Sequence, residues 1–258
     1  MRVCHIADVH WRGLKRHEEY TEVFERLALD ARKQKVDRIV VAGDIVHTKT
    51  MGISPELIQR LTWWFNHLAE IAPVIVTLGN HDGLILNKSR MDTITPIINT
   101  LSNPRIIFLR DSTQYYDDEF NVVWTNFSCF DEENWGNFRP IEDKTNIALF
   151  HGAIAKSTTD IGWEIESECD LSLFAGFDFG MFGDIHKFQY LDPAKRFAYP
   201  GSTIQQDYSE DIDKGYLLWD IQSKNEYRSV RRIIKSPNPF YTVEWDGSPD
   251  LTFSSCNE

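Results

Sequence analysis

Residues 37–47 read DRIVVAGDIVH, an apolar run that ends in Gly43 and Asp44 and, three residues further on, His47. The run has the composition of a buried strand in a sheet covered on both faces. Glycine lets the backbone turn sharply, so a carboxylate and an imidazole follow directly where the strand stops. The segment therefore predicts a buried strand whose carboxyl end carries ligand-binding groups, as in α/β sheets generally.

Strand and helix patterns alternate through the first half of the chain. Further strands are predicted at residues 2–7, 74–79 and 105–109. Apolar residues at spacings of three and four predict helices over residues 20–31, 55–71 and 91–101. Ser54 followed by Pro55 is typical of a helix start. This order predicts a largely parallel sheet covered by helices.

The second half is richer in strands and poorer in helices. Strand-like segments occur at residues 120–127, 146–152, 173–183, 196–202 and 216–221. Together with the first half they predict an α/β protein in which a two-sheet β-sandwich is flanked by helices.

Composition excludes several classes of protein. The 258 residues carry a net charge of −12, so no global basic field attracts nucleic acid or anionic membranes. The four cysteines form no CxxC pair, which argues against a zinc ribbon and a disulfide scaffold. No run approaches the length of about 20 apolar residues that a membrane span needs. The first predicted strand begins at Arg2. We expect a soluble protein of a reducing compartment.

Five apolar segments end in Asp, Asn or His, usually beside Gly. The blocks are Asp8-Val9-His10, Gly43-Asp44-Ile45-Val46-His47, Gly79-Asn80-His81-Asp82, His151-Gly152 and Gly183-Asp184-Ile185-His186. Each alone fits an ordinary turn. Together they concentrate charge that is costly unless cations neutralise it. The oxygen and nitrogen donors suit Mn²⁺, Fe²⁺, Mg²⁺ or Zn²⁺, and their number predicts two ions, as in phosphoryl transfer.

The five blocks, in this order, resemble the signature of calcineurin-like metallophosphoesterases. The segments YPGSTIQQDY (199–208) and KGYLLWDI (214–221) are similar to the SbcD-type nuclease subunit of double-strand-break processing complexes and its phage relatives. The resemblance implies the metallophosphoesterase fold over residues 1–235. Residues 236–258 are then the start of a capping segment that is either truncated or naturally minimal.

The resemblance also implies how the metal ligands divide. The first ion takes Asp8, His10 and His186, and Asp44 bridges both ions. The second ion takes Asn80, His151 and the residue at position 184. The family has His there and this chain has Asp184. A carboxylate oxygen is a competent ligand for a hard divalent ion, and the alternative is a weak or vacant second site. Alternation along an extended segment would put Asp184 and His186 on one side.

The implied reaction is hydrolysis of a phosphodiester by two divalent ions, Mn²⁺ or else Mg²⁺. His81 would protonate the leaving 3′ oxygen. Asp82 would orient His81 or merely cap a turn, and His47 would contact the phosphate or be an ordinary loop residue. The candidates for binding DNA phosphates are Arg12, Lys15, Arg16, His17, Lys88, Arg90 and Lys187, unless they are only solvated loop charges.

Three functions remain open. The first is the nuclease subunit of an SbcC–SbcD-like complex in DNA repair, recombination and replication. Its partners would be DNA and an SbcC-like ATPase, with a homodimer also considered and no membrane. It would act in the cytoplasm of a bacterial cell or a phage-infected host. The second is another phosphoesterase, either a protein phosphatase or a small-molecule phosphodiesterase. The third is a scaffold whose catalytic site has decayed at Asp184.

Overall fold

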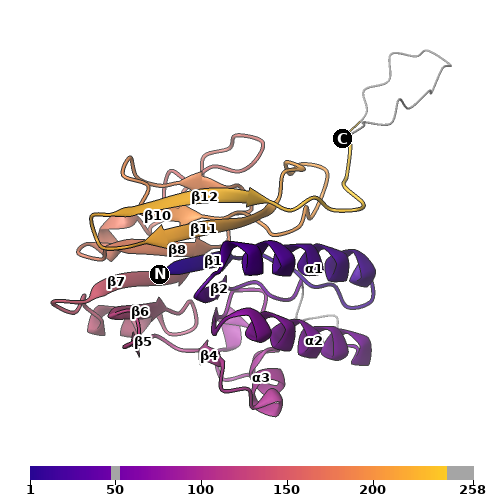
Figure 1. The fold of residues 1–258 in the computed structure, drawn as a ribbon, viewed down its shortest axis with the longest axis horizontal. Helices are drawn as coiled ribbons and strands as arrows, with labels where there is room; N and C mark the ends of the chain where they lie inside the picture. The colour runs from indigo at the N-terminus through magenta and orange to yellow at the C-terminus, as the bar shows by residue number, and fades with distance from the viewer. Residues whose placement is uncertain (48–52, 243–258) are drawn as a thin grey trace.

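A computed structural model describes residues 1–47 and 53–242, which form two packed sheets with helices α1 and α2 lying side by side (Figure 1). The strands are β1 Arg2–Ile6, β2 Arg38–Ala42, β3 Val74–Thr77, β4 Ile106–Leu109, β5 Thr113–Asp117, β6 Val122–Phe127, β7 Thr145–His151, β8 Phe179–Gly183, β9 Gln189–Tyr190, β10 Phe197–Tyr199, β11 Gly215–Ile221 and β12 Tyr227–Ile233. The helices are α1 His17–Gln34, α2 Pro55–Ile71 and α3 Thr95–Leu101, with 3₁₀ turns η1 Ile85–Asn87, η2 Glu132–Asn137 and η3 Leu171–Phe174.

Both sheets have six strands and a parallel centre. The first has the order β12-β11-β1-β2-β3-β4, in which β1 to β4 are parallel. The second has the order β5-β6-β7-β8-β10-β9, in which β6, β7, β8 and β10 are parallel. The remaining strands of each sheet pair antiparallel. The predicted two-sheet α/β fold is therefore confirmed, and both sheets are mixed with parallel strands at their centre.

The central strands β1, β2 and β3 of the first sheet are buried on both faces, which explains their continuous apolar sequences. In β2, Ile39 and Val41 pack with the helices, whereas Val40 and Ala42 pack against the second sheet. Side chains alternate between the faces of a strand, so a strand covered on both sides needs apolar residues at every position. This arrangement accounts for the run RIVVA before Gly43.

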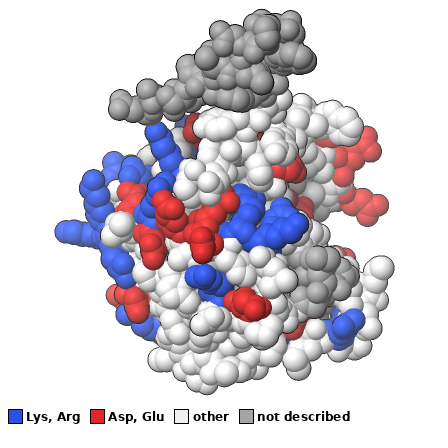
Figure 2. Space-filling view, turned by 90° about the vertical axis from the view of Figure 1, so that its right-hand side faces the viewer, with Lys and Arg blue, Asp and Glu red and all other residues white. Residues whose placement is uncertain are grey.

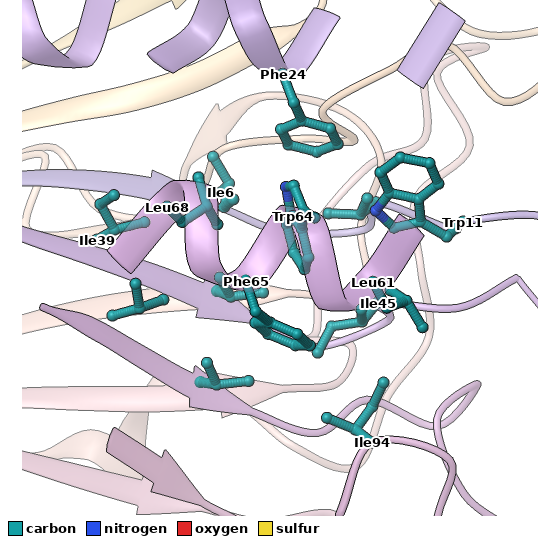
Figure 3. Close-up of a cluster of buried hydrophobic side chains, with 14 of the residues drawn as sticks. Ile6, Trp11, Phe24, Ile39, Ile45, Leu61, Trp64, Phe65, Leu68 and Ile94 are labelled. Atoms are coloured by element: carbon teal, nitrogen blue, oxygen red, sulfur yellow. The ribbon is translucent and has the colours of Figure 1, made fainter. Parts of the chain in front are cut away.

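The helical layer is held by large aromatic side chains. Ser54 accepts a hydrogen bond from the Leu57 amide and caps α2, as its sequence predicts. Trp64 of α2 is fully buried and packs edge-on against Phe24 of α1 at 5.0 Å between ring centroids (Figure 3). Trp11, from the loop after β1, contacts both rings. The first ligand-bearing loop is thereby anchored in the core.

Two predicted elements begin well after the residue at which they were predicted to start. The predicted strand 173–183 is a 3₁₀ turn followed by β8, because Gly176 adopts a left-handed conformation (φ 89°) that interrupts the extended chain. The predicted helix 91–101 begins only at Thr95. Asp92 accepts hydrogen bonds from the backbone amides of Ile94 and Thr95, so the residues before Thr95 form a turn.

The predicted boundary at residue 235 lies two residues after β12 and stays a prediction. Of the predicted capping segment 236–258, residues 243–258 lie outside the described residues. In the part of the chain that is described, none of the helices combines the length and the apolar character needed to cross a membrane.

Candidate metal centre

The loops after the strands are bonded to one another at the carboxyl edge of the sheets. The Asp8 and His10 amides donate to the carbonyls of Gly43 and Asp44, at 3.2 and 2.9 Å. The Asp184 amide donates to the Asp8 carboxylate at 2.9 Å. The Gly152 amide donates to the Gly183 carbonyl at 3.2 Å. These bonds gather loops that are far apart in the sequence around one point.

Four of the gathered residues have a left-handed backbone. The φ angles are 50° at Asp8, 53° at His10, 50° at Asp44 and 98° at Asp184. Residues other than glycine seldom adopt such angles, and those that do cluster at functional sites. The alternation expected for Asp184 and His186 is therefore wrong, since the chain after Gly183 turns instead of continuing as a strand.

Three glycines leave room for the cluster. A Cβ atom on Gly43 would lie 2.3 Å from His151 Nδ1, and one on Gly79 would lie 2.2 Å from Asp44 Oδ1. A Cβ atom on Gly183 would lie 2.0 Å from the carbonyl oxygen of Ala42. No side chain fits at these distances, so the glycines of the sequence blocks are required by packing around Asp44 and His151.

Among the residues that the structure describes, three groups of ligand atoms lie close enough to hold an ion, with the atoms of each group within 4.8 Å of one another. They are Asp8–His10–His186, Asp8–Asp44–His151 and His10–Asp44–His81. The first two share Asp8, and Asp44 lies beside both, with its Oδ2 3.5 Å from His10 Nε2 and its Oδ1 3.2 Å from His151 Nε2. Carboxylates between two adjacent groups of imidazoles form a candidate dimetal site.

Asn80 extends the group around His151. Its side-chain amide position facing the cluster lies 3.1 and 3.2 Å from the two Asp44 carboxylate oxygens and 3.2 Å from His151 Nε2. An amide oxygen placed there faces two carboxylate oxygens and an imidazole nitrogen, which suits coordination of a shared cation. The donors thus fit the divalent ions that the residue types predict.

Asp184 lies on the same side as Asn80 and His151. Its Oδ1 is 3.8 Å from His151 Nε2, and its side chain is 26% exposed. Asn80, His151 and Asp184 line one pocket, whereas His10 and His186 meet on the other side, with their Nε2 atoms 3.0 Å apart. Asp184 is therefore placed where it could supply an oxygen to the second ion.

The electrostatics around His186 and His151 favour positive charge, whereas burial lowers the pKa of His10 to about 3. Burial alone would lower the pKa of His186, but the hydrogen bond to Glu210 and the charge of Asp8 raise it to about 9. Burial would also lower the pKa of His151, but the Asp44 carboxylate raises it well above its usual range. The raised pKa values of His186 and His151 reflect the carboxylates beside them, whose charge metal cations would also neutralise.

Two histidines are oriented through their Nδ1 atoms. His151 Nδ1 lies 2.7 Å from the Ala42 carbonyl oxygen, and His186 Nδ1 lies 2.5 Å from Glu210 Oε1. Each contact leaves Nε2 facing the cluster, as is usual for metal-binding histidines. Buried Glu210 also accepts from Ser202, the Gln206 amide and Lys214. Glu210 was not predicted from the sequence, because one Glu within DYSEDID has no distinguishing spacing.

We expect Glu210→Gln to weaken Mn²⁺ binding at one site by about 10–100-fold, the usual cost of losing a carboxylate that supports a metal-binding histidine. Calorimetric titration of the metal-free protein would measure it. Exposed Glu226→Gln is the matched control. Equal Mn²⁺ affinity in both variants would show that Glu210 does not support the site.

His81 borders the cluster without being enclosed by it. Its side chain is 42% exposed, and its Nε2 lies 4.0 Å from Asp44 Oδ2. Its Nδ1 lies 2.5 Å from the His47 carbonyl oxygen. That carbonyl, rather than Asp82, orients the ring. Asp82 is fully buried and accepts bonds from the backbone amides of Ile45, Val46 and Gly79, so it fixes the loops that carry Asp44 and Asn80.

Of the predicted DNA contacts, Arg12 lies beside the cluster. Its Nη1 is 3.2 Å from His47 Nε2, and its Nη2 donates to the Gln206 carbonyl. The other predicted contacts are exposed or bound elsewhere. Lys15 and Arg90 are exposed, Arg16 pairs with Glu19, His17 bonds to the Arg12 carbonyl, Lys88 pairs with Glu133, and Lys187 donates to Thr158.

Comparison with known families identifies the fold and its ligand blocks. Residues 1–188, which include all five blocks, match the calcineurin-like phosphoesterase family. The chain belongs to this family. Metallophosphoesterases are dinuclear-metal hydrolases, and the candidate dimetal site lies where the family's blocks meet.

Among its relatives, the chain is 38% identical over 239 residues to the uncharacterized protein R555 of Acanthamoeba polyphaga mimivirus, covering 86% of this chain and 17% of that protein. It is 26% identical to the DNA double-strand break repair protein Mre11 of Archaeoglobus fulgidus, covering 81% and 52%. It is 22% identical to SbcD of the SbcCD nuclease of Staphylococcus epidermidis, covering 95% and 73%. The phosphoesterase thus spans about half of this Mre11 and a smaller part of R555.

Solved structures support the fold alone. A dimetal phosphatase from Danio rerio superimposes with a TM-score of 0.51 at 12% identity, covering 92% of this chain and 99% of that one. GAP50, the anchor in the inner membrane complex of Plasmodium, superimposes with a TM-score of 0.53 at 12% identity, covering 96% and 98%. Both likenesses extend over the two sheets.

Proposed function

We propose that this phosphoesterase is a metal-dependent nuclease that hydrolyses DNA phosphodiesters. The supporting observation is that the chain combines a cluster of overlapping Asp and His ligand groups with weak similarity to Mre11 and SbcD over most of its length. In this proposal the chain acts, as a monomer or a homodimer, as the nuclease subunit of a DNA end-processing complex that also contains an SbcC-like ATPase.

In this proposal the ligands divide between two Mn²⁺ or Mg²⁺ ions. Asp8, His10 and His186 hold the first ion, and Asn80, His151 and Asp184 hold the second, with Asp44 between them. When bound, the ions activate water and neutralise charge on the phosphate. The glycines and Asp82 fix the positions of these ligands, and the Glu210 and Ala42 oxygens orient the two histidines.

His81, His47 and Arg12 act on the substrate in this proposal. His81 is exposed at the edge of the cluster, where it can protonate the leaving oxygen. His47 and Arg12 lie together on the His81 side of the cluster. The Arg12 guanidinium can bind a phosphate there, because its donors match phosphate oxygens in geometry and charge.

The test is incubation of the purified chain with Mn²⁺ and end-labelled linear duplex DNA, with and without EDTA. The proposal is supported if labelled nucleotides are released, if EDTA abolishes this release and if the Asp44→Asn variant releases none. Turnover of phosphopeptides or cyclic nucleotides with intact DNA would identify another phosphoesterase. DNA or ATPase binding without hydrolysis of any of these substrates would identify a scaffold.

DNA binding by the isolated chain should depend only weakly on salt. Lys and Arg alternate with Asp and Glu on the face shown in Figure 2, and the net charge is −12. Few neutralised phosphates give a shallow slope of log affinity against log salt, well below that of about 6–10 contacts. Fluorescence anisotropy between roughly 50 and 200 mM salt would measure this slope. A steep slope would reveal an unrecognised basic face.

A further inference from the structure

A pocket of about 280 Å³ adjoins the second-ion side of the cluster. Its lining includes Asn80, His151 and Asp184 together with Glu132, Trp135 and Phe150. Its volume is just below the roughly 300–1,000 Å³ of pockets for drug-sized ligands, so it suits a single small heterocycle.

Trp135 gives this pocket a rigid aromatic wall. The residue lies in η2, and its Nε1–H donates to the Ser128 carbonyl at 2.8 Å. Its ring packs edge-on against Phe150 at 5.5 Å and Phe127 at 6.4 Å. These contacts fix the indole, while the residue stays only half-buried. A held but accessible indole is what proteins use to stack nucleic-acid bases.

The charges of the lining select against phosphate. None of the pocket residues that the structure describes is Lys or Arg, and Glu132 contributes a carboxylate that is not among the proposed ion ligands. A neighbouring pocket of about 530 Å³ shares Trp135 and Glu132 and adds Glu168 and Asp170. Away from the proposed ion ligands these carboxylates disfavour a phosphate, whereas a neutral aromatic ring with N–H donors could stack on the indole and donate to the Glu132 carboxylate.

We propose that this pocket binds the nucleobase of the nucleotide next to the scissile phosphate, stacked on Trp135. This inference rests on the proposed nuclease function, and it assigns recognition of a substrate base to the pocket beside the second-ion ligands. The phosphate then lies at the ligand cluster, while the carboxylate-lined pocket holds the uncharged base. Stacking is tolerant of sequence, so the pocket recognises a base without specifying which one.

The first test separates base binding from hydrolysis. The metal-free protein is titrated with 2′-deoxyadenosine, which has no phosphate, by isothermal titration calorimetry, because this readout does not depend on the indole that the variant removes. We expect Trp135→Leu, which keeps apolar volume but no ring, to bind at least roughly tenfold more weakly, as loss of one stacking contact implies. Trp163→Ala, at an exposed tryptophan outside the pocket, is the control. Thermal melting shows whether each variant is folded, and Trp135→Phe should restore binding.

The second test measures cleavage of DNA in which the nucleotide at the cleaved end is abasic. The parental enzyme should cleave normal DNA roughly tenfold faster than abasic DNA, and folded Trp135→Leu should treat the two alike. Equal rates in the parental enzyme, or nucleoside binding that Trp135→Leu leaves unchanged, would overturn the proposal. Binding that depends on Trp135 without any DNA hydrolysis would support the pocket and refute the nuclease.

Discussion

His81→Gln should lower cleavage of linear DNA by about 10²–10⁴-fold, the usual contribution of a general acid. Mn²⁺ content and DNA affinity should stay near parental values. The expectation follows from an exposed ring whose Nδ1 lies against the His47 carbonyl oxygen and whose Nε2 borders Asp44. Gln can bond to a phosphate oxygen but cannot deliver a proton at neutral pH. Single-turnover rates measure cleavage and metal analysis measures the Mn²⁺ content of the same preparations.

The competing role for His81 is that of a metal ligand, because it forms a possible donor group with His10 and Asp44. Loss of bound Mn²⁺ from His81→Gln, in step with loss of cleavage, would establish that role. His67→Gln is the matched control, since His67 stacks on Trp63 within α2. It should change neither quantity.

Much of the fold was predictable because burial on both faces leaves a clear pattern. The central strands of the first sheet need apolar residues, and the glycine and polar residues that follow them mark where each strand stops. The polar segment 113–117 escaped prediction, because β5 lies at a sheet edge with most of its side chains only half-buried. Such a strand lacks the apolar pattern on which the prediction depends.

The motifs predicted which residues bear the ligands, but not how their side chains reach the cluster. Asp8, His10, Asp44 and Asp184 turn toward the cluster through left-handed backbone angles, which sequence alternation cannot show. Glu210 and the role of Asp82 depend on contacts between segments distant in the chain, such as Glu210 with His186. Short motifs indicate which residues bear the chemistry, whereas the residues that orient them become visible only in three dimensions.

Asp184→Ala should remove one Mn²⁺ from the protein at concentrations where the parental chain binds two. Losing a residue that merely supports a ligand costs about 10–100-fold in metal affinity, so losing a ligand itself should cost at least as much. Cleavage should fall accordingly, while the fold persists because the side chain is at the edge of the cluster. Calorimetry and anomalous scattering from Mn²⁺-soaked crystals would count the ions. Asp207→Ala, at an exposed position, is the control.

Asp184→His tests the same residue in the opposite direction. Imidazole is the family's usual ligand at this position, so the variant should still bind two ions. A third carboxylate makes the native site harder and more anionic, which favours Mn²⁺ or Mg²⁺ over softer ions. The histidine variant should therefore shift its optimum toward Zn²⁺ or Co²⁺. If Asp184→Ala kept two fully occupied sites and near-parental cleavage, Asp184 would be no ligand, and the second ion would be held by Asn80, His151 and Asp44 alone.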